Sequence, residues 1–303
     1  MRGARILVTG PTGQVAGPLA LTLAADNEVW GVARFRDAAA RERLEAAGVR
    51  CVTTDLATGT YEGLPDRVDY VLNFAVAHGG ADDFDRDIAA NAEATGLLMQ
   101  RFGDAQAFLH CSTTGVYEPA GHHRLKETDP LGDNHRVMMP TYSVCKIAAE
   151  AVARTAARQF DLPTTIARLN VPYGDHGGWP WFHLQMMLAG QPVPVHPDAP
   201  NLYNPIHDDD IAAQVPRMLE IASVPATIVN WAGREQASIE EWCAYLGRLT
   251  GLEARFVSTD QTIGSVTTDN TRMHELVGET TVSWRDGLRR MVAVGHPELL
   301  EHE

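Results

Sequence analysis

Residues 7–24, LVTGPTGQVAGPLALTLA, run from a short apolar segment through a glycine turn into a helix-forming segment. Gly10 permits the tight turn, and Gly13 lets backbone N–H groups approach an anion held at the N-terminus of the helix. Ala16 occupies the third position of the pattern, where a small side chain allows the helix to pack closely on the strand. An ordinary strand–helix connection is the alternative. The pattern lies in the first such connection of an alternating chain, which favours a dinucleotide-binding turn.

Strand-like and helix-like segments alternate along the first half of the chain. The β-rich runs cover residues 4–10, 28–34, 49–55, 69–75, 107–113 and 163–170. The helical patterns cover residues 17–26, 37–48, 85–103 and 142–161. Alternation of this kind predicts βαβ units, and nearly continuous apolar strands predict a sheet covered on both faces. The predicted fold class is therefore α/β, with a Rossmann-type doubly wound parallel sheet.

The pattern changes after Gly174. Proline and glycine become frequent, as in QPVPVHPDAPNLYNP at residues 191–205, and only residues 226–233 and 253–258 resemble strands. We expect a smaller C-terminal α+β lobe that closes over the sheet. The predicted division is a dinucleotide-binding domain at 1–174 and a substrate-binding lobe at 175–303, with some segments of the lobe returning to the sheet.

Composition narrows the class of partner. The 303 residues are 45% hydrophobic and 21% charged, which are ordinary values for a chain with a real core. A formal net charge of -14 argues against nucleic acid and anionic membranes, since both attract positive surfaces. The four cysteines show no close pairing, which is typical of reduced thiols. The N-terminus has no signal-peptide pattern, and no apolar run approaches the ~20 residues that span a bilayer. We expect a cytoplasmic protein with a small-molecule substrate.

The end of the second strand bears on the choice of dinucleotide. An acidic residue there usually contacts the ribose hydroxyl of NAD, but this chain carries Ala33, Arg34 and Arg36. A guanidinium can bind a 2′-phosphate in a bidentate manner, so the sequence favours NADP over NAD. Solvated charges at a helix entry are the alternative. Asp55, after the third strand, is placed either to contact the adenine or to form a turn.

Tyr142 and Lys146 open a helical pattern in the segment TYSVCK. Side chains four residues apart lie on one face of a helix, with Cβ atoms about 5–6 Å apart. The spacing suits a phenol and an ammonium acting as an acid–base pair, although it also arises by chance.

Several segments, in this order, resemble the extended short-chain dehydrogenase/reductases, also described as the NAD-dependent epimerase/dehydratase family. The resemblance covers most of the chain. It rests on TGPTGQVAG (9–17), NFAVA (73–77), NAEATGLL (91–98), CSTTGVYE (111–118), YSVCK (142–146), RLNVPYG (168–174) and IHDDDIA (206–212).

The resemblance implies catalytic roles for four residues. Tyr142 exchanges a proton with the reacting oxygen, and Lys146 lowers the pKa of the phenol and holds the nicotinamide ribose. Thr113 hydrogen-bonds the reacting oxygen, with Ser112 as an adjacent second candidate. Asn91 supports a proton path to the lysine. Structural hydrogen bonding is the alternative for Thr113 and Asn91.

The resemblance also implies binding residues and a homodimer formed through the helices at 84–102 and 142–160. The expected cofactor contacts are Gly10, Thr12, Gly13, Gln14, Val15, Arg34, Asp55, Leu56, Phe74, Ala75, Tyr142, Lys146 and Pro172. The expected substrate contacts are His78, Thr114, Asn170, Trp179, Phe182, Tyr203 and His207. The aromatic and methionine stripe at 179–187 is either core or pocket wall.

We expect no metal, because the His122–His123 pair and the acidic run 208–210 lack ligand spacing. Asp208, Asp209 and Asp210 instead suit the start of a helix, as caps and as partners of its dipole.

Two departures from the family pattern bear on the substrate. Relatives that act on sugar nucleotides carry an asparagine where this chain has Val171, although the adjacent Asn170 leaves a one-residue ambiguity. They also carry an arginine for the pyrophosphate where this chain has Tyr203. We therefore expect an NAD(P)-dependent carbonyl reductase or alcohol dehydrogenase for a small, largely apolar ketone or alcohol. The alternative is a nucleotide-sugar epimerase or dehydratase with tightly held NAD(P). A non-catalytic nucleotide-sensing regulator is disfavoured because Thr113, Tyr142 and Lys146 are all present.

Overall fold

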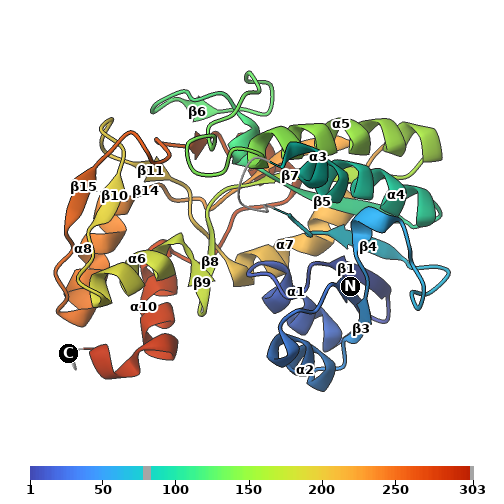
Figure 1. Ribbon diagram of the computed structural model, residues 1–303, viewed down its shortest axis with the longest axis horizontal. Helices are drawn as coiled ribbons and strands as arrows, with labels where there is room; N and C mark the ends of the chain where they lie inside the picture. The colour runs from blue at the N-terminus through green and yellow to red at the C-terminus, as the bar shows by residue number, and fades with distance from the viewer. Residues whose placement is uncertain (78–82, 301–303) are drawn as a thin grey trace.

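The computed structural model describes residues 1–77 and 83–300, and its centre is a seven-stranded parallel sheet (Figure 1). The strand order is β13-β7-β5-β4-β1-β2-β3, with neighbouring strands parallel throughout. The strands are β1 (Arg5–Thr9), β2 (Glu28–Ala33), β3 (Arg50–Thr53), β4 (Tyr70–Asn73), β5 (Ala107–Thr113), β7 (Thr164–Leu169) and β13 (Thr227–Trp231). The predicted α/β doubly wound fold is confirmed.

Helices cover both faces of this sheet. On one face lie α3 (Phe84–Ile88), α4 (Ala94–Arg101) and α5 (Tyr142–Phe160), and on the other lie α1 (Ala16–Ala24), α2 (Ala38–Ala46) and α7 (Asp208–Glu220) (Figure 1). A π-helical turn at Ala89–Glu93 joins α3 to α4, so the predicted helix at 85–103 is one segment with a local bulge. π-Bulges are frequent at functional positions because the extra residue reorients side chains.

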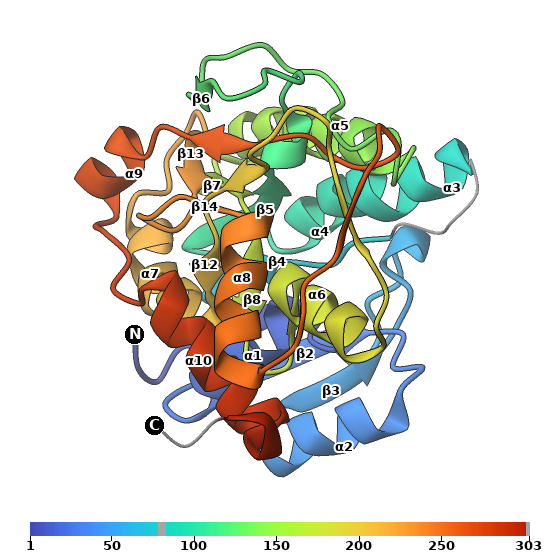
Figure 2. The same ribbon diagram turned by 90° about the vertical axis from the view of Figure 1, so that its left-hand side faces the viewer.

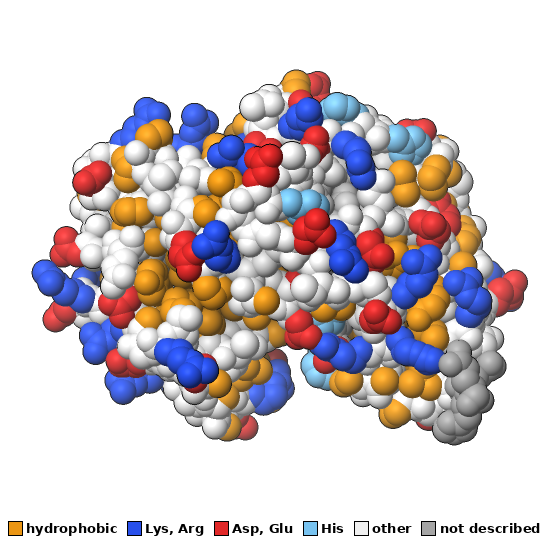
Figure 3. Space-filling view, turned by 180° about the vertical axis from the view of Figure 1, so that it is seen from behind, with side chains coloured by type: hydrophobic (Ala, Val, Ile, Leu, Met, Phe, Trp, Pro, Cys, Tyr) orange, Lys and Arg blue, Asp and Glu red, His pale blue; other side chains and the backbone are white. Residues whose placement is uncertain are grey.

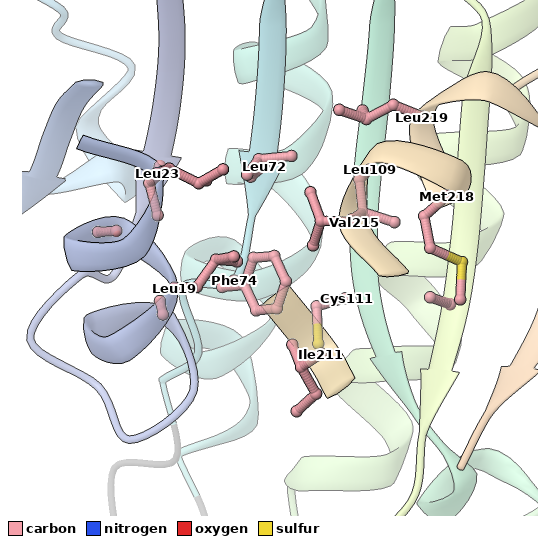
Figure 4. Close-up of a cluster of buried hydrophobic side chains, with 14 of the residues drawn as sticks. Leu19, Leu23, Leu72, Phe74, Leu109, Cys111, Ile211, Val215, Met218 and Leu219 are labelled. Carbon is pink, nitrogen blue, oxygen red and sulfur yellow. The ribbon is translucent and has the colours of Figure 1, made fainter. Parts of the chain in front are cut away.

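The core explains why the strands are apolar throughout. Every residue of β5 is buried, as expected for a central parallel strand with helices on both sides. On the face of α1 and α7, ten labelled side chains interdigitate between the helices and the sheet (Figure 4). They are Leu19, Leu23, Leu72, Phe74, Leu109, Cys111, Ile211, Val215, Met218 and Leu219.

The C-terminal lobe has a second core. Its main helices are α6 (Trp179–Leu188), α8 (Ile239–Thr250) and α10 (Trp284–Gly295), which lie side by side in front of the sheet in Figure 2. Trp242 and Trp284 are both buried in this second hydrophobic cluster. Its smaller elements are β8 (Pro172–Gly174), β9 (Gly177–Gly178), β10 (Val193–Val195), β11 (Leu202–Tyr203), β12 (Ile206–His207), β14 (Ala237–Ser238), β15 (Phe256–Ser258) and β16 (Thr267–Thr268). The short helix α9 (Thr271–Leu276) packs on β13 of the main sheet.

The two halves of the chain exchange segments. β13 pairs with β7 in the main sheet, and α7 packs on the same sheet beside α1. In return, β6 (Arg124–Leu125) leaves the first half and pairs with β16. Seen from behind, the molecule is notched between the sheet and the lobe, and charges of both signs are interspersed on that face (Figure 3). A division at residue 174 therefore describes the chain order better than it describes the packing.

The N-terminus of α7 differs from the sequence expectation. The cap is His207, whose Nδ1 accepts a hydrogen bond from the backbone N–H of Asp209 at 3.0 Å. Asp209 instead pairs with Arg290, and the Asp210 carboxylate accepts the N–H groups of Thr281 and Val282. The extended backbone of His207 lets its ring reach the orphan N–H, so the carboxylates serve tertiary contacts.

Asp208 is the member of the acidic run 208–210 whose carboxyl group is buried unfavourably. Its Oδ1 is buried without a hydrogen-bond partner among the described residues. Burial raises the pKa of its carboxyl to about 8, and the charges of Asp175 and Asp209 act in the same direction. The folded state therefore prefers the neutral acid, and ionisation destabilises it.

We expect Asp208→Asn to raise the free energy of unfolding by about 1–3 kcal/mol near pH 8, because the amide is never charged. Asp208 of the wild type is protonated in both states below its ordinary pKa of 3.8, so the gain should be absent at pH 3.5. It should grow as the pH rises from about 4 to about 8, where the folded protein keeps a proton that the unfolded chain has lost, and it should level off above pH 8. Urea unfolding at both pH values measures this difference, and Asp209→Asn is the matched control that should give no gain. An equal gain at both pH values would contradict the assignment.

Candidate active site

A cavity of about 230 Å³ opens at the carboxyl ends of the central strands, facing the C-terminal lobe. Ligands of open parallel sheets bind at this edge. Its walls come from the glycine turn, the strand ends, α5 and the lobe, and include Gln14, Val15, Phe74, Cys111, Ser112, Thr113, Thr114, His135, Met139, Tyr142, Lys146, Leu169, Asn170, Val171, Pro172, Trp179, Tyr203 and Val266.

Tyr142 and Thr113 meet inside this cavity. Thr113 ends β5, and Tyr142 is the first residue of α5. Burial raises the pKa of the Tyr142 phenol to about 12, and a hydrogen bond with the Thr113 side chain opposes that rise. The Thr113 oxygen accepts the N–H of Gly115 at 3.0 Å, which leaves its own proton to donate. The pair can therefore hold and polarise one substrate oxygen.

Lys146 lies one turn further along α5 and is buried. Its Nζ donates to the backbone carbonyl of Cys111 at 2.7 Å, and burial lowers the pKa of the ammonium. The expectation that Lys146, together with an oxidised nicotinamide ring, lowers the pKa of Tyr142 stays a prediction. Loss of solvent dominates at the phenol, and the ammonium is directed at the Cys111 carbonyl. The other two N–H groups of the Lys146 ammonium could donate to the ribose of a bound dinucleotide.

Asn91 lies in the π-helical turn and outside the cavity wall. Its Nδ2 donates to the carbonyls of Ala77 and Asp87, both at 2.7 Å, and its Oδ1 accepts the N–H of Ala77 at 2.9 Å. The amide thus ties the chain after β4 to the helix. Structural hydrogen bonding, which was the alternative to a proton path for Asn91, accounts for these contacts.

The glycine turn fits a dinucleotide. Gly10 has φ +68°, and a Cβ there would meet the Ala75 backbone at 2.9 Å. Thr9 fixes the neighbouring strand end, since its Oγ1 accepts the N–H groups of Phe74 and Ala75 at 3.0 and 2.9 Å. Only glycine allows this close approach with a left-handed backbone. The turn therefore presents backbone N–H groups at the start of α1, where an anion is favoured.

The other predicted cofactor residues follow the same edge. Gln14 donates from Nε2 to the Pro172 carbonyl at 2.9 Å, which joins the glycine turn to the lobe. Arg34 is exposed just after β2, and Asp55 is exposed after β3. Asp55 accepts the N–H of Ala57 at 3.1 Å and so forms the turn that the sequence left as its alternative. Leu56, which follows, is partly buried.

Four predicted substrate residues line the cavity, namely Thr114, Asn170, Trp179 and Tyr203. The amide of Asn170 is engaged on both sides, donating to Thr114 Oγ1 at 3.1 Å and accepting the N–H of Asn204 at 3.1 Å. Asn170 therefore fixes the cavity wall, and its amide is already occupied. Tyr203 donates its hydroxyl to the carbonyls of Ile263 and Gly264.

Two predicted substrate residues lie elsewhere. Phe182 is 56% exposed, because its position on α6 faces away from the side that buries His183 and Leu184. His207 caps α7 and packs edge-on against Tyr173 with ring centroids 5.1 Å apart. Neither lines the cavity.

A third predicted substrate residue, His78, falls outside the described residues. The aromatic stripe divides as well. Trp179 lines the cavity, whereas Trp181 stacks on His296 with centroids 5.4 Å apart. Of the two roles predicted for the stripe, core and pocket wall, Trp181 therefore has the core role.

Two residues that were not predicted from the sequence, His135 and Met139, line the cavity from the loop before α5. No motif marks this loop, and its only signal is the closeness of NHRVMM to Tyr142 along the chain. Within 1–77 and 83–300, no group of three or more His, Cys, Asp or Glu residues could hold a metal ion. In that same part of the chain no helix is both long and apolar enough to cross a membrane.

The sheet, the glycine turn and the Tyr142–Lys146 pair define an enzyme of the short-chain dehydrogenase/reductase type. The model of the NAD dependent epimerase/dehydratase family matches residues 6–231, and the chain belongs to this family. The family resemblance drawn from the sequence is confirmed.

Curated relatives are distant. A low-salt glycan biosynthesis protein of Haloferax volcanii, Agl12, is 27% identical over 239 residues, which cover 74% of each chain. A trifunctional UDP-glucose 4,6-dehydratase/UDP-4-keto-6-deoxy-D-glucose 3,5-epimerase/UDP-4-keto-L-rhamnose-reductase of Arabidopsis thaliana is 24% identical over 251 residues, covering 75% of this chain. The match spans only 36% of that relative's length.

Solved structures share the fold. The UDP-glucuronic acid 4-epimerase from Bacillus cereus, in complex with UDP-glucuronic acid and NAD, superposes with a TM-score of 0.79 at 22% identity, covering 96% of this chain and 98% of that one. DesIV, the dTDP-glucose 4,6-dehydratase from Streptomyces venezuelae, gives a TM-score of 0.79 at 23% identity and 96% coverage of each chain.

Proposed function

We propose that the protein oxidises and re-reduces a secondary alcohol of a nucleotide sugar, and so acts as an epimerase with a resident nicotinamide dinucleotide. The observation that carries the proposal is the meeting of Thr113, Tyr142 and Lys146 in one cavity beside the glycine turn. A bound nicotinamide supplies and accepts the hydride. Tyr142 gives or takes the proton of the reacting oxygen, Thr113 orients that oxygen, and Lys146 holds the ribose.

The relatives bear on the class of substrate. They include a UDP-sugar epimerase and a dTDP-glucose dehydratase, both of them in structures that contain NAD. The carbonyl-reductase interpretation favoured by the sequence finds no support in these comparisons. The nucleotide-sugar alternative fits them better.

Within that alternative, the cavity favours epimerisation over dehydration. Elimination of water next to a ketone needs one group to remove a carbon-bound proton and another to protonate the leaving hydroxyl. Paired carboxylates commonly do such work, yet no Asp or Glu is found among the described residues that line the cavity. Hydride transfer with exchange of the substrate face needs only the alcohol's own proton, which Tyr142 can carry.

Net reduction of a substrate without a pyrophosphate is the second candidate, and one observation favours it. Tyr203 lies where sugar-nucleotide relatives are expected to carry an arginine, and its hydroxyl is engaged by two backbone carbonyls at 3.0 and 2.8 Å. Among the described cavity-lining residues, Lys146 is the one lysine or arginine. A pyrophosphate would lack its bidentate partner there.

One experiment separates these candidates. The purified protein is mixed with NAD or NADP and, in turn, UDP-glucose, UDP-glucuronic acid and dTDP-glucose, and the sugar is analysed by NMR. A parallel series contains NADPH and a ketone. Epimerisation predicts a change of configuration at one carbon with no net accumulation of reduced cofactor. Stoichiometric consumption of NADPH with a ketone, and no epimer, would instead support the second candidate. If neither occurs, the proposal fails.

We further propose that the protein accepts NADP(H), because the end of β2 offers the exposed Arg34 and no carboxylate. A charge-assisted contact to the 2′-phosphate is worth about 1.5–3 kcal/mol, which is tenfold or more in affinity. Calorimetry should therefore show tighter binding of NADPH than of NADH. The double variant Ala33→Asp, Arg34→Asn should reverse that order. Equal affinities in the unmodified protein would remove the argument.

A further inference from the structure

The loop before α5 places an imidazole beside the catalytic phenol. His135 lines the cavity, and its ring centroid lies 5.5 Å from that of Tyr142, with the planes tilted by 38°. The ring also packs on Gly115, where an added Cβ would meet His135 Nδ1 at 2.9 Å. His135 is thus held against the strand end that carries Thr113.

Its neighbour Asn134 determines which ring nitrogen carries the proton. Asn134 is buried, and its side chain donates from Nδ2 to the backbone carbonyl of Thr114 at 3.0 Å. A carbonyl can only accept, so this contact fixes the orientation of the amide and turns Oδ1 toward His135 Nδ1. Oδ1 is itself only an acceptor. The proton of His135 therefore lies on Nδ1.

The other nitrogen is then a bare lone pair. Nε2 has no hydrogen-bond partner among the described residues. It is not one of the fully buried polar atoms of that part of the chain that lack a partner. Burial lowers the pKa of His135 to about 4, so the ring is neutral near pH 7 and Nε2 remains an acceptor. Hydroxyl-bearing neighbours in the cavity, such as Tyr142 and Thr113, can donate a hydrogen bond to a substrate. His135 Nε2 can only accept a hydrogen bond.

We propose that His135 is a specificity-determining residue that accepts a hydrogen bond from a substrate hydroxyl on the carbon next to the reacting one. The substrate class is accordingly a vicinal diol or hydroxyketone. This reaction-site assignment rests on the proposed hydride chemistry. Tyr142 takes the reacting oxygen, and the adjacent imidazole takes the neighbouring hydroxyl. A substrate without that hydroxyl leaves Nε2 desolvated and unpaired, which a site of this kind strongly disfavours.

The first test needs no substrate. Two-bond ¹⁵N–¹H spectra of the protein with ¹⁵N-labelled histidine distinguish the two tautomers, and His135→Phe assigns the signal by removing it. We expect the Nδ1–H tautomer at pH 7 with an unprotonated Nε2. Protonation of Nε2 at pH 7, as Nε2–H or imidazolium, would overturn the proposal.

The second test pairs substrates with and without the hydroxyl. The probes are UDP-glucose against its 3-deoxy analogue, and 2-hydroxycyclohexanone against cyclohexanone. The wild type should prefer the hydroxylated member by at least about tenfold in kcat/KM. His135→Phe keeps the ring volume and should reduce that preference to within threefold, mainly through KM. His135→Gln, which retains an acceptor, should restore part of it.

The outcomes separate two failures. An equal loss on both members of a pair would mean that His135 only supports the fold, and it would overturn the specificity role. If the wild type turns over none of the four probes, the proposed hydride chemistry fails for these classes. The tautomer of His135 then decides the inference alone, with a bare Nε2 sustaining it and a protonated one overturning it.

Discussion

Tyr142→Phe is expected to lower kcat by about 10³-fold while the dinucleotide still binds within a few-fold of its wild-type affinity. The variant removes one oxygen atom at the start of α5 and keeps the ring that packs beside His135. Thr113 can still orient the reacting oxygen, but no group in contact with that oxygen can exchange its proton. Lys146, which would hold the ribose, keeps its contact with Cys111.

The matched control is Tyr203→Phe. Tyr203 also lines the cavity, yet its hydroxyl is committed to the carbonyls of Ile263 and Gly264. This second phenol should therefore affect stability more than the chemical step. Stopped-flow measurement of hydride transfer and calorimetry of cofactor binding report the two effects separately. A rate within a few-fold of wild type for Tyr142→Phe would contradict the proposed proton exchange by Tyr142.

The pH dependence follows from the same residue. Burial raises the pKa of Tyr142 to about 12, so the phenol is protonated across the ordinary working range. Proton donation, which accompanies reduction, should then be flat between pH 6 and 9. The oxidative direction needs the phenolate and should become faster with rising pH.

Local spacing explains what the sequence could predict. Tyr142 and Lys146 are four residues apart on one helix, so their meeting on one face needs no knowledge of the rest of the fold. The glycine turn is equally local, since Gly10 and Gly13 act on a single strand–helix connection. The strands could be recognised because burial on both faces makes them apolar throughout.

The remaining site depends on contacts between distant segments. His135 enters the cavity from an irregular loop, whose path is set by the pairing of β6 with β16 and by Asn134 bound to Thr114. Phe182 and Trp179 share an aromatic stripe, and only the rotation of α6 against its neighbours shows which of them faces the cavity. His207 matches a family position but caps a helix, because the backbone there is extended.

The class of substrate was also difficult to predict from the sequence, because it depends on contacts between distant segments. Tyr203 signals a missing guanidinium in the sequence, and the structure shows its hydroxyl bound to backbone carbonyls. From Tyr203 in place of an arginine we predicted an apolar ketone as substrate. The family and its structural relatives favour a sugar nucleotide. A single substitution changes one contact of a substrate, which is weak ground for choosing between whole substrate classes.

The buried ion pair behind the cavity carries the second large effect. Arg168 on β7 donates to the Glu150 carboxylate on α5 through Nε at 3.0 Å and Nη2 at 2.7 Å. Both side chains are less than 5% exposed. Ser112 also donates to the Glu150 carboxylate, and the guanidinium lies 4.8 Å above the Tyr117 ring. The pair thus joins α5, the helix that carries Tyr142, to β7, and the Ser112 contact joins the same carboxylate to β5, the strand that carries Thr113.

Glu150→Ala is expected to lower the free energy of unfolding by about 3–5 kcal/mol, because it leaves the Arg168 charge buried without its partner. Glu150→Leu combined with Arg168→Met removes both charges and fills the space, so the double variant should recover most of that loss. The control is Glu45→Ala, which breaks the exposed pair of Glu45 with Arg41 and should cost less than about 0.5 kcal/mol. Urea unfolding of the four proteins measures these differences. A loss below about 1 kcal/mol for Glu150→Ala would mean that water reaches Arg168 and screens it. A loss of the expected size would mean that the buried ion pair stabilises the packing of α5, which carries Tyr142, against the sheet.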